Sequence, residues 1–194
     1  MTSQSFVPIL LDFPEFFETE RLRVSAPQWG DGTAVNEAIR ESLEELKPWM
    51  PFAQTQPSLA DSETFVRDSR LKFLNRSQLN MLIFDKTGGG FLGCTGLHHI
   101  DWDARCFEIG YWIRTSSAGH GYITEAVNGV TAFAIRELEA NRIEIRCSRL
   151  NTRSAAVAER AGYSLDGILR LSTRATNGEL HDSMVYAKVR GTEF

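Results

Sequence analysis

A glycine-containing turn between an expected strand and an expected helix constrains this sequence most. Residues 107–113 read Phe-Glu-Ile-Gly-Tyr-Trp-Ile, and residues 117–122 then read Ser-Ala-Gly-His-Gly-Tyr before a long segment with helical periodicity. The start of a helix presents free backbone N–H groups and about half a positive charge, which favours a phosphate. Glycine allows the backbone to approach a ligand closely. The turn therefore predicts a phosphate-binding site, with an ordinary surface turn as the alternative.

Two other phosphate-binding patterns fit the same residues poorly. The sequence has no Gly-x-x-x-x-Gly-Lys-[Ser/Thr] pattern, which disfavours a nucleotide triphosphatase. A dinucleotide fingerprint needs a third Gly or Ala where Thr124 stands, and an acidic residue closing the next strand, where Cys147-Ser148-Arg149 stands. Arg114, just before the turn, and His120, within it, are candidates for additional cationic contacts with a phosphate.

The periodicity of the rest of the chain predicts one mixed sheet flanked by helices. Strands are expected at residues 19–24, 81–84, 91–94, 106–113 and 143–145 and on both sides of the Asn177-Gly178 turn; helices are expected at 34–46, 61–74, from 121 onward and at 154–161. An antiparallel meander, a strand-helix-strand crossover and a final hairpin indicate an α/β (α+β) fold. We predict a single domain over residues 1–194, with an N-terminal extension at 1–17 and a mixed, mostly antiparallel sheet of about seven strands.

Charge and cysteine content exclude several classes of protein. The 25 acidic and 21 basic residues give a net charge of -4, and no long run of Lys or Arg indicates direct binding of nucleic acid. Cys94, Cys106 and Cys147 form no C-x-x-C pair and have no His at metal-ligand spacing, so we expect reduced thiols and no metal site. The apolar run from Val7 to Leu11 is too short for a signal core or a membrane span. These features predict a cytoplasmic protein with no membrane contact.

Further segments accompany the turn in a specific order. Glu108-Ile109-Gly110-Tyr111-Trp112-Ile113 precedes Gly119-His120-Gly121-Tyr122-Ile123-Thr124-Glu125-Ala126, and Asn151-x-x-Ser154-x-x-Val157-x-Glu159-Arg160-x-Gly162-Tyr163 follows. Together they resemble the GNAT acetyltransferase superfamily. The opening Glu18-Thr19-Glu20-Arg21-Leu22 and the late Gly167-Ile168-Leu169-Arg170 with His181-Asp182 are similar to its ribosomal-protein-alanine N-acetyltransferase branch, of the RimJ and RimL type. The match extends from about Glu18 to Val189.

The resemblance implies acetyl-coenzyme A as the cofactor, with its pyrophosphate on the backbone amides of the turn. It also implies that the pantetheine arm pairs with the edge of the strand at 111–113, because a bulge splays this strand from the next one. The cofactor-binding residues implied in this way are Tyr111, Trp112, Ile113, Arg114, Ala118, Gly119, His120, Gly121, Tyr122, Ile123, Thr124, Asn151 and Ser154.

The chain departs from the family pattern at four positions. Ala118 stands where Gln or Arg is common, and Ile123 stands where Gly or Ala is common. Many GNAT branches place a Tyr that protonates the thiolate at the position of Ala158, so Ser154 is the better candidate for that acid here. The carboxylate that the RimL type is thought to use falls at Thr173. The resemblance therefore leaves the general base unassigned.

Three residues are candidates for the chemistry, each with an alternative role. Glu108, a carboxylate within a largely apolar strand, is the candidate base, acting directly or through water, unless it is a solvated residue paired with Arg105 or another neighbour. Ser154 is either the acid or a residue of the helix N-terminus. Asn151 bonds the pantetheine arm, caps the following helix, or does both.

Other side chains are candidates for the acceptor site. His98 and His99, expected in the loop after the meander, are predicted to line the acceptor pocket, and Trp49 either forms its wall or fills the core. Cys147 raises the possibility of an acetyl-cysteine intermediate, although a small buried residue is the commoner reading of such a cysteine. No metal role is expected.

The predicted function is transfer of the acetyl group of acetyl-CoA to a primary amine by direct attack, foremost a protein N-terminal α-amine. The alternatives are acetylation of a small-molecule amine (a polyamine, amino sugar, amino acid or antibiotic) and a non-catalytic module that senses coenzyme A. The acceptor is expected to contact residues 36–77 and 171–181. The protein is expected to be a monomer or a homodimer.

Overall fold

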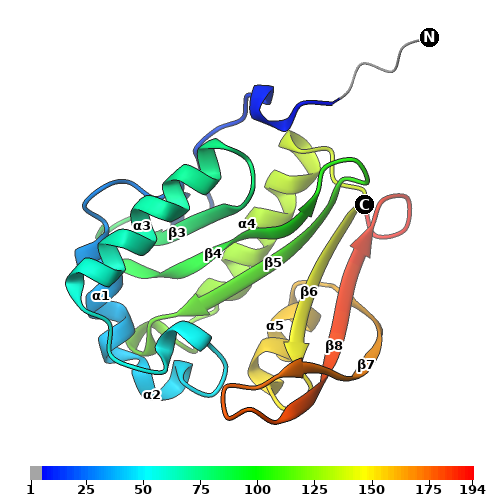
Figure 1. Ribbon diagram of the computed structural model, residues 1–194. Helices are drawn as coiled ribbons and strands as arrows, with labels where there is room; N and C mark the ends of the chain where they lie inside the picture. The colour runs from blue at the N-terminus through cyan, green and yellow to red at the C-terminus, as the bar shows by residue number, and fades with distance from the viewer. Residues whose placement is uncertain (1–5) are drawn as a thin grey trace.

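Eight strands form one mixed sheet with helices on both faces (Figure 1), in a computed structural model that describes residues 6–194. The strands are β1 (Phe16–Glu18), β2 (Leu22–Ser25), β3 (Leu79–Asp85), β4 (Phe91–Asp101), β5 (Cys106–Ile113), β6 (Arg142–Ser148), β7 (Ser164–Arg174) and β8 (Leu180–Val189). The helices are α1 (Gly32–Glu41), α2 (Leu43–Leu46), α3 (Leu59–Leu74), α4 (Tyr122–Glu137) and α5 (Thr152–Arg160), with single 3₁₀ turns η1 (Pro8–Leu10), η2 (Pro51–Ala53) and η3 (Thr115–Ser117). The sheet order is β1-β2-β3-β4-β5-β6-β8-β7.

The sheet confirms the predicted fold class and has one strand more than predicted. The additional strand, β1, pairs with β2 and lies partly within the expected N-terminal extension. Its three residues are too few to show a reliable strand period. Leu22 and Val24 of β2 are fully buried, whereas Arg23 and the preceding Arg21 face solvent, as the alternation predicts.

The helices before β3 differ in their bounds from the prediction. The single helix expected at 34–46 is divided into α1 and α2 at Ser42, whose buried hydroxyl accepts a hydrogen bond from the Thr115 backbone N–H (2.9 Å). Helix α3 begins at Leu59 instead of Asp61, because Ser58 and Asp61 form a capping box.

Two hydrophobic clusters hold the helices against opposite faces of the sheet. Strand β3 contributes Met81 and Ile83 to the cluster under α4, which includes Phe133, and Leu82 to the cluster under α1 and α3, which includes Val66. Burying each such side chain contributes roughly 1.5–3 kcal/mol. The sheet is therefore covered on both sides within one domain. None of the helices in residues 6–194 combines the length and the apolar content needed to cross a bilayer.

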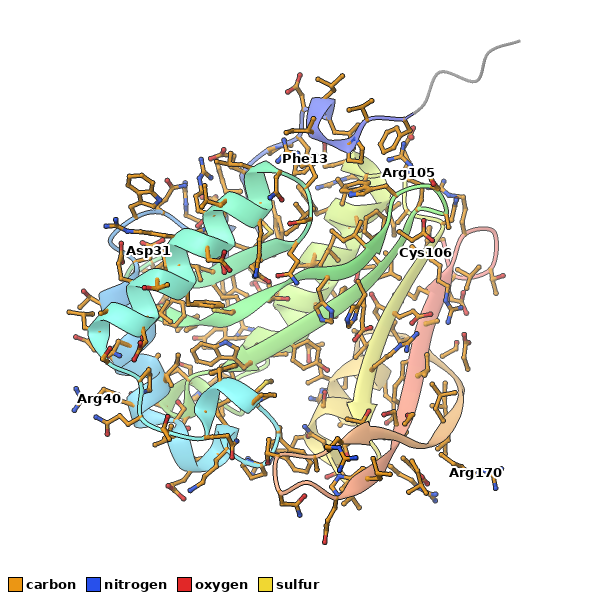
Figure 2. All side chains as sticks on the ribbon, in the orientation of Figure 1. Phe13, Asp31, Arg40, Arg105, Cys106 and Arg170 are labelled. Carbon is orange, nitrogen blue, oxygen red and sulfur yellow. The ribbon has the colours of Figure 1, made fainter. Side chains whose placement is uncertain are left out.

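The functional region is set by the way β5 and β6 separate. These two parallel strands pair only at Cys106–Glu108 with Arg142–Glu144, and they diverge beyond that point (Figure 1). Figure 2 shows Arg105 and Cys106 at the closed end, beside the turn that joins β4 to β5. Strand β5 remains paired with β4 up to Ile113, and β6 remains paired with β8. An opening is therefore held between two rigid halves of the sheet.

Candidate active site

A cleft of about 560 Å³ fills the opening between β5 and β6. Its walls include residues 108–112 of β5, 145–148 of β6, the loop at 48–51 and the β7–β8 hairpin. The edge of β5 from Ile109 to Ile113 has no partner in β6. Its backbone groups on that side are available to pair with an extended ligand. This confirms the splayed geometry that the family resemblance implied.

The glycine-containing turn ends at the start of α4, next to the open part of β5. Gly119 (φ 81°) and Gly121 (φ 80°) both adopt a left-handed backbone conformation, which a side chain would strain. Gly121 is the N-cap of α4, and no side chain caps the helix there. The first amides of α4 are therefore free to bind an anion through the backbone, which suits a turn whose Ala118 offers no side-chain donor.

Arg21 and Glu125 brace this turn, and the sequence did not identify them. The Glu125 carboxylate accepts hydrogen bonds from the Arg21 Nε (2.7 Å), the Arg21 backbone N–H (2.8 Å) and the Thr19 hydroxyl (2.5 Å). Arg21 also donates to the His120 carbonyl (3.0 Å), and its guanidinium lies 4.6 Å from the centre of the Tyr122 ring. Although burial alone would raise the pKa of Glu125, these hydrogen bonds and the Arg21 charge lower it. The brace is charged at neutral pH.

Several predicted cofactor residues direct their side chains away from the turn. The Arg114 guanidinium forms an ion pair with Glu41 of α1 (2.5 Å). Trp112 and Ile123 are buried in the two hydrophobic clusters, so they can offer a ligand their backbone only. Among the cationic side chains expected near the turn, Arg114 is therefore paired elsewhere, and Arg21 lies where Arg114 was expected.

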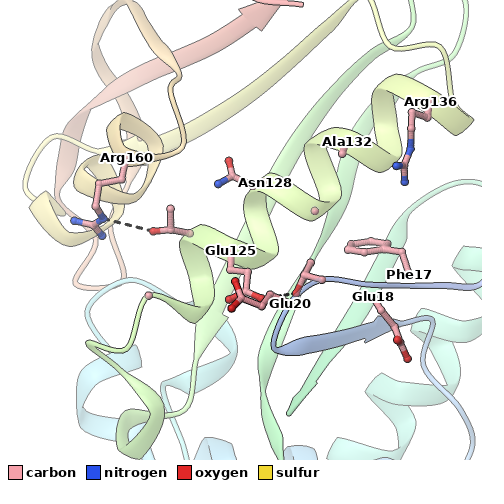
Figure 3. A pocket seen from close by; sticks show the side chains of 12 residues that line it. Phe17, Glu18, Glu20, Glu125, Asn128, Ala132, Arg136 and Arg160 are labelled. Carbon is pink, nitrogen blue, oxygen red and sulfur yellow. Dashed lines mark hydrogen bonds between the residues drawn. The ribbon is translucent and has the colours of Figure 1, made fainter. Parts of the chain in front are cut away.

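A second hollow of about 630 Å³ lies beside the turn, between α4 and the β1–β2 segment. Figure 3 shows Glu125 among the residues that line it, and Arg160 reaching from α5 toward the start of α4. The Arg160 Nε donates to the Thr124 hydroxyl at 3.5 Å. Thr124 is thus held at the rim of this hollow, adjoining the free helix amides.

Ser154 is linked to both β5 and the preceding loop. The Asn151 side chain accepts a hydrogen bond from the Ser154 backbone N–H (3.1 Å), which confirms its capping role for α5. The Ser154 hydroxyl lies 2.9 Å from the Tyr111 hydroxyl, which also donates to the Ser154 carbonyl. Burial raises the pKa of Tyr111 to about 12, so Tyr111 remains a proton donor at neutral pH. Ser154 therefore has a protonated partner within hydrogen-bond distance.

Cys147 lies in the same wall, at the β6 side of the cleft. Its thiol is buried, and burial raises its pKa above the ordinary value, with a hydrogen bond to Ser154 as a smaller, opposing influence. A thiol with a raised pKa has little of the thiolate that attacks thioesters. The geometry thus favours the reading of Cys147 as a small buried residue over an acetyl-cysteine intermediate.

Glu108 is the only carboxylate among the described residues that line the cleft. Its side chain is 12% exposed and lies 3.0 Å from the His99 Nδ1 and 3.5 Å from the Arg146 Nε. Arg105, the partner considered from the sequence, instead lies 3.7 Å from Glu139. Glu108 is therefore a paired carboxylate inside the cleft and not a solvated surface residue.

His98 and His99 both line the cleft, and the expectation that they lie in a loop was wrong. They belong to β4, which continues to Asp101, and the β4–β5 register shifts between His98 and Asp101. His99 has a positive φ of 46° at this bulge. Consecutive strand residues normally face opposite sides of a sheet, and the bulge brings both rings to the same side.

The two histidines and Glu108 bring possible metal-ligand atoms within 4.8 Å of one another. The His98 and His99 Nδ1 atoms lie 3.1 Å apart, and the His99 Nδ1 lies 3.0 Å from Glu108. Arg146 already supplies a positive charge next to the Glu108 carboxylate. Hydrogen bonds and this charge thus account for the arrangement without a metal ion.

One end of the cleft is formed by the loop before η2 and by the β7–β8 hairpin. Trp49 lines it and is 37% exposed, so it forms a wall and does not fill the core. Thr173, at the position where the family resemblance implied a carboxylate, is hydrogen-bonded to the Ser183 hydroxyl. His181, a cleft residue that sequence reasoning did not assign a role, has its Nδ1 3.3 Å from the Ser148 hydroxyl.

This combination defines a class of protein. A sheet split between parallel strands, a free strand edge and an uncapped helix start fit a transferase that binds an acyl-coenzyme A along the strand and over the turn. Residues 21–164 match the acetyltransferase (GNAT) domain family. The chain belongs to this family and is an acetyl-CoA-dependent N-acetyltransferase that acts on an amine acceptor.

Relatives and solved structures agree with this assignment. The chain is 34% identical over 163 residues to the Bacillus subtilis (strain 168) protein named "Putative ribosomal N-acetyltransferase YdaF", covering 82% of this chain and 86% of that protein. Among solved structures, RimL, a ribosomal L7/L12 alpha-N-protein acetyltransferase in complex with coenzyme A, shares the fold with a TM-score of 0.83, at 22% identity over 90% of this chain and 98% of that chain. The microcin C7 self-immunity acetyltransferase MccE, in complex with acetyl-CoA and AMP, has a TM-score of 0.82 and 25% identity over 91% and 97% of the two chains.

Proposed function

We propose that this enzyme acetylates the N-terminal α-amine of a protein, with a ribosomal protein as the foremost acceptor. The observation that carries the proposal is the similarity to YdaF, which is named as a ribosomal N-acetyltransferase and aligns over most of both chains. The cleft supports it, because its acceptor end lies between the loop at Trp49 and the β7–β8 hairpin, both at the molecular surface. An extended N-terminal segment would enter between these two walls.

The coenzyme is proposed to lie along the free edge of β5, with its pyrophosphate on the backbone of residues 118–124. The acetyl group then reaches the part of the cleft between Tyr111 and Ser154. A backbone amide of residues 111–113 polarises the thioester carbonyl, and such donors are worth roughly 2.7–4 kcal/mol in other acyl transferases. The Ser154 hydroxyl, 2.9 Å from the Tyr111 hydroxyl, protonates the departing thiolate.

Glu108 is proposed to supply the negative charge that assists removal of the amine proton. It is the sole carboxylate among the described cleft residues and lies on the strand that carries the free edge. The attacking amine must be neutral, and the product amide has one proton fewer on nitrogen than the amine. A negative charge next to the group that accepts this proton stabilises the protonated, positively charged form of that group.

An acceptor panel tests the proposal. Peptides with free N-terminal Ser or Ala are mixed with acetyl-CoA and enzyme, and free thiol release and peptide mass are followed together. The matched controls carry a blocked N-terminus and an internal Lys. Acetylation of the free α-amine and not of the blocked peptide is expected; acetylation of the Lys in both peptides would contradict the proposed acceptor.

A small-molecule amine is the second candidate acceptor. The similarity to MccE, an acetyltransferase of microcin self-immunity, favours it specifically. Polyamines, amino sugars, amino acids and amine-bearing antibiotics therefore form the second arm of the panel. A kcat/KM for one of these that exceeds the best peptide value by about tenfold or more would assign the enzyme to this group, since a tenfold difference corresponds to about 1.4 kcal/mol.

A further inference from the structure

We propose that His98 accepts the proton from the attacking amine, and that Glu108 stabilises the imidazolium that forms. The inference deepens the proposed function and rests on it. The Glu108 Oε2 lies 3.5 Å from the Arg146 Nε, and the side chain is only 12% exposed. A carboxylate held in this way is better placed to act through a neighbour than to contact an amine itself.

The His98 ring lies against the strand edge where the acetyl group is expected. A Cβ atom placed on Gly110 would be 2.7 Å from the His98 Nε2, so this nitrogen contacts the backbone of β5 one residue before Tyr111. Glycine at position 110 leaves the space that the ring occupies. His98 therefore lines the cleft with its ring over Gly110, in the part of β5 that has no partner in β6, whereas His99 is 78% exposed and points to Glu108.

The electrostatic surroundings of His98 suit a base at neutral pH. Burial lowers the pKa of His98, which keeps the ring neutral, and its Nε2 can accept a proton in the tautomer whose Nδ1–H donates to the His99 Nδ1 3.1 Å away. The groups facing it are His99 on its own strand, Glu108 on β5 and, beyond Glu108, Arg146 on β6. The Glu108 Oε1 lies 3.9 Å from the His98 Nε2, so a negative charge is already in place when the ring becomes positive. The carboxylate faces the accepting nitrogen itself and lies beyond hydrogen-bond distance, so it acts on the imidazolium through its charge.

The proton balance of the reaction is complete with these groups. The amine nitrogen forms a bond to the acetyl carbon and gives one proton to the His98 Nε2. The bond from carbon to sulfur breaks, and the sulfur takes the proton of the Ser154 hydroxyl. Between turnovers His98 returns its proton to solvent, and Ser154 regains one from solvent.

The test compares wild type with His98→Ala, using the acceptor found in the panel. We expect kcat to fall by about 10² or more, as for the loss of a general base. Added neutral imidazole is expected to restore part of the rate of His98→Ala, which also shows that the variant is folded. The controls are His99→Ala and His181→Ala, which remove the other two imidazoles that line the cleft. Their kcat should fall less than that of His98→Ala, and added imidazole should not raise it.

The outcomes separate the two proposals. If the wild type is active and the His98→Ala variant has the same kcat, the role of His98 is overturned and the proposed function stands. If only His181→Ala shows a large fall in kcat, the base is His181 on β8 and not His98. Loss of wild-type activity on dialysis against a metal chelator would assign the cluster to metal binding and would also overturn the inference. A wild type that acetylates no amine overturns the proposed function and the role of His98 with it.

Discussion

The two ends of the cleft are built differently. At the end where we propose that the coenzyme binds, backbone groups of β5 and of the α4 start are exposed to the cleft, and the side chains of Trp112 and Ile123 are buried. At the acceptor end, β7 is exposed along nearly its whole length, including Leu169 (45% exposed) and Leu171 (61%). Contacts made by the backbone do not depend on side-chain identity, whereas contacts made by the wall at the acceptor end do. Substitutions at the two ends should therefore affect different kinetic constants.

The largest effect is expected where the two ends meet. Ser154→Ala removes the proposed acid, so kcat should fall about 10²-fold while the KM for acetyl-CoA changes little. Tyr111→Phe is the matched variant, because it keeps Ser154 and removes the Tyr111 hydroxyl that lies 2.9 Å from the Ser154 hydroxyl. Its kcat should fall by roughly tenfold or less. Steady-state kinetics with thiol detection give both constants. Wild-type turnover in Ser154→Ala would remove this residue from the chemistry.

A smaller effect, limited to the coenzyme end, is expected for Glu125→Gln. The variant weakens the ion pair with Arg21 and so loosens the turn. A loss of about 1.4 kcal/mol in the free energy of acetyl-CoA binding would raise the KM for acetyl-CoA tenfold. The value of kcat should stay within about twofold, because the reacting groups are untouched. Glu20→Gln, which changes an exposed carboxylate next to Arg21 in the sequence (Figure 3), is the control and should behave as wild type. A fall in kcat at unchanged KM would contradict the bracing role.

The same brace predicts a pH dependence of stability. The pKa of Glu125 is lowered in the folded protein, so its contribution is present above the unfolded value of 4.5 and is lost as the pH falls through the lower folded value. The free energy of unfolding of wild type should thus exceed that of Glu125→Gln by about 1–3 kcal/mol at pH 7. The difference should shrink below pH 4.5. Urea unfolding at several pH values measures it, and a constant difference down to pH 3 would argue against a charged brace.

Local patterns predicted the secondary structure around the proposed coenzyme end well. The bounds of β5 (Cys106–Ile113) agree with the prediction, because alternation and the following glycines are local signals. The cap formed by Asn151 is equally local, since the acceptor and donor are three residues apart. Main-chain sites of this kind are specified by short segments of sequence, and these could be identified before the structure was available.

Long-range pairs and irregular backbone could not be predicted in this way. Arg21 and Glu125 are 104 residues apart, and each looks like an ordinary surface charge in its own segment. The bulge at His99 depends on how β4 pairs with β5, and no sequence period marks it. The partners of Glu108 were missed for the same reason, because Arg146 comes from a different strand. The base was therefore the least predictable part of the site.

The smallest effect is expected at the acceptor end, for Thr173→Ala. Its hydroxyl is bonded to the Ser183 hydroxyl, so removing it breaks one neutral hydrogen bond, worth about 0.5–1.5 kcal/mol. We expect kcat/KM for the acceptor to change by roughly threefold, with an unchanged KM for acetyl-CoA. Ser172→Ala, which removes a neighbouring hydroxyl bonded to the Leu169 carbonyl, is the matched control. A 10²-fold loss in Thr173→Ala alone would place a proton-transfer role on the β7–β8 hairpin and not on the β4 bulge, and the contrast between the two ends would have to be redrawn.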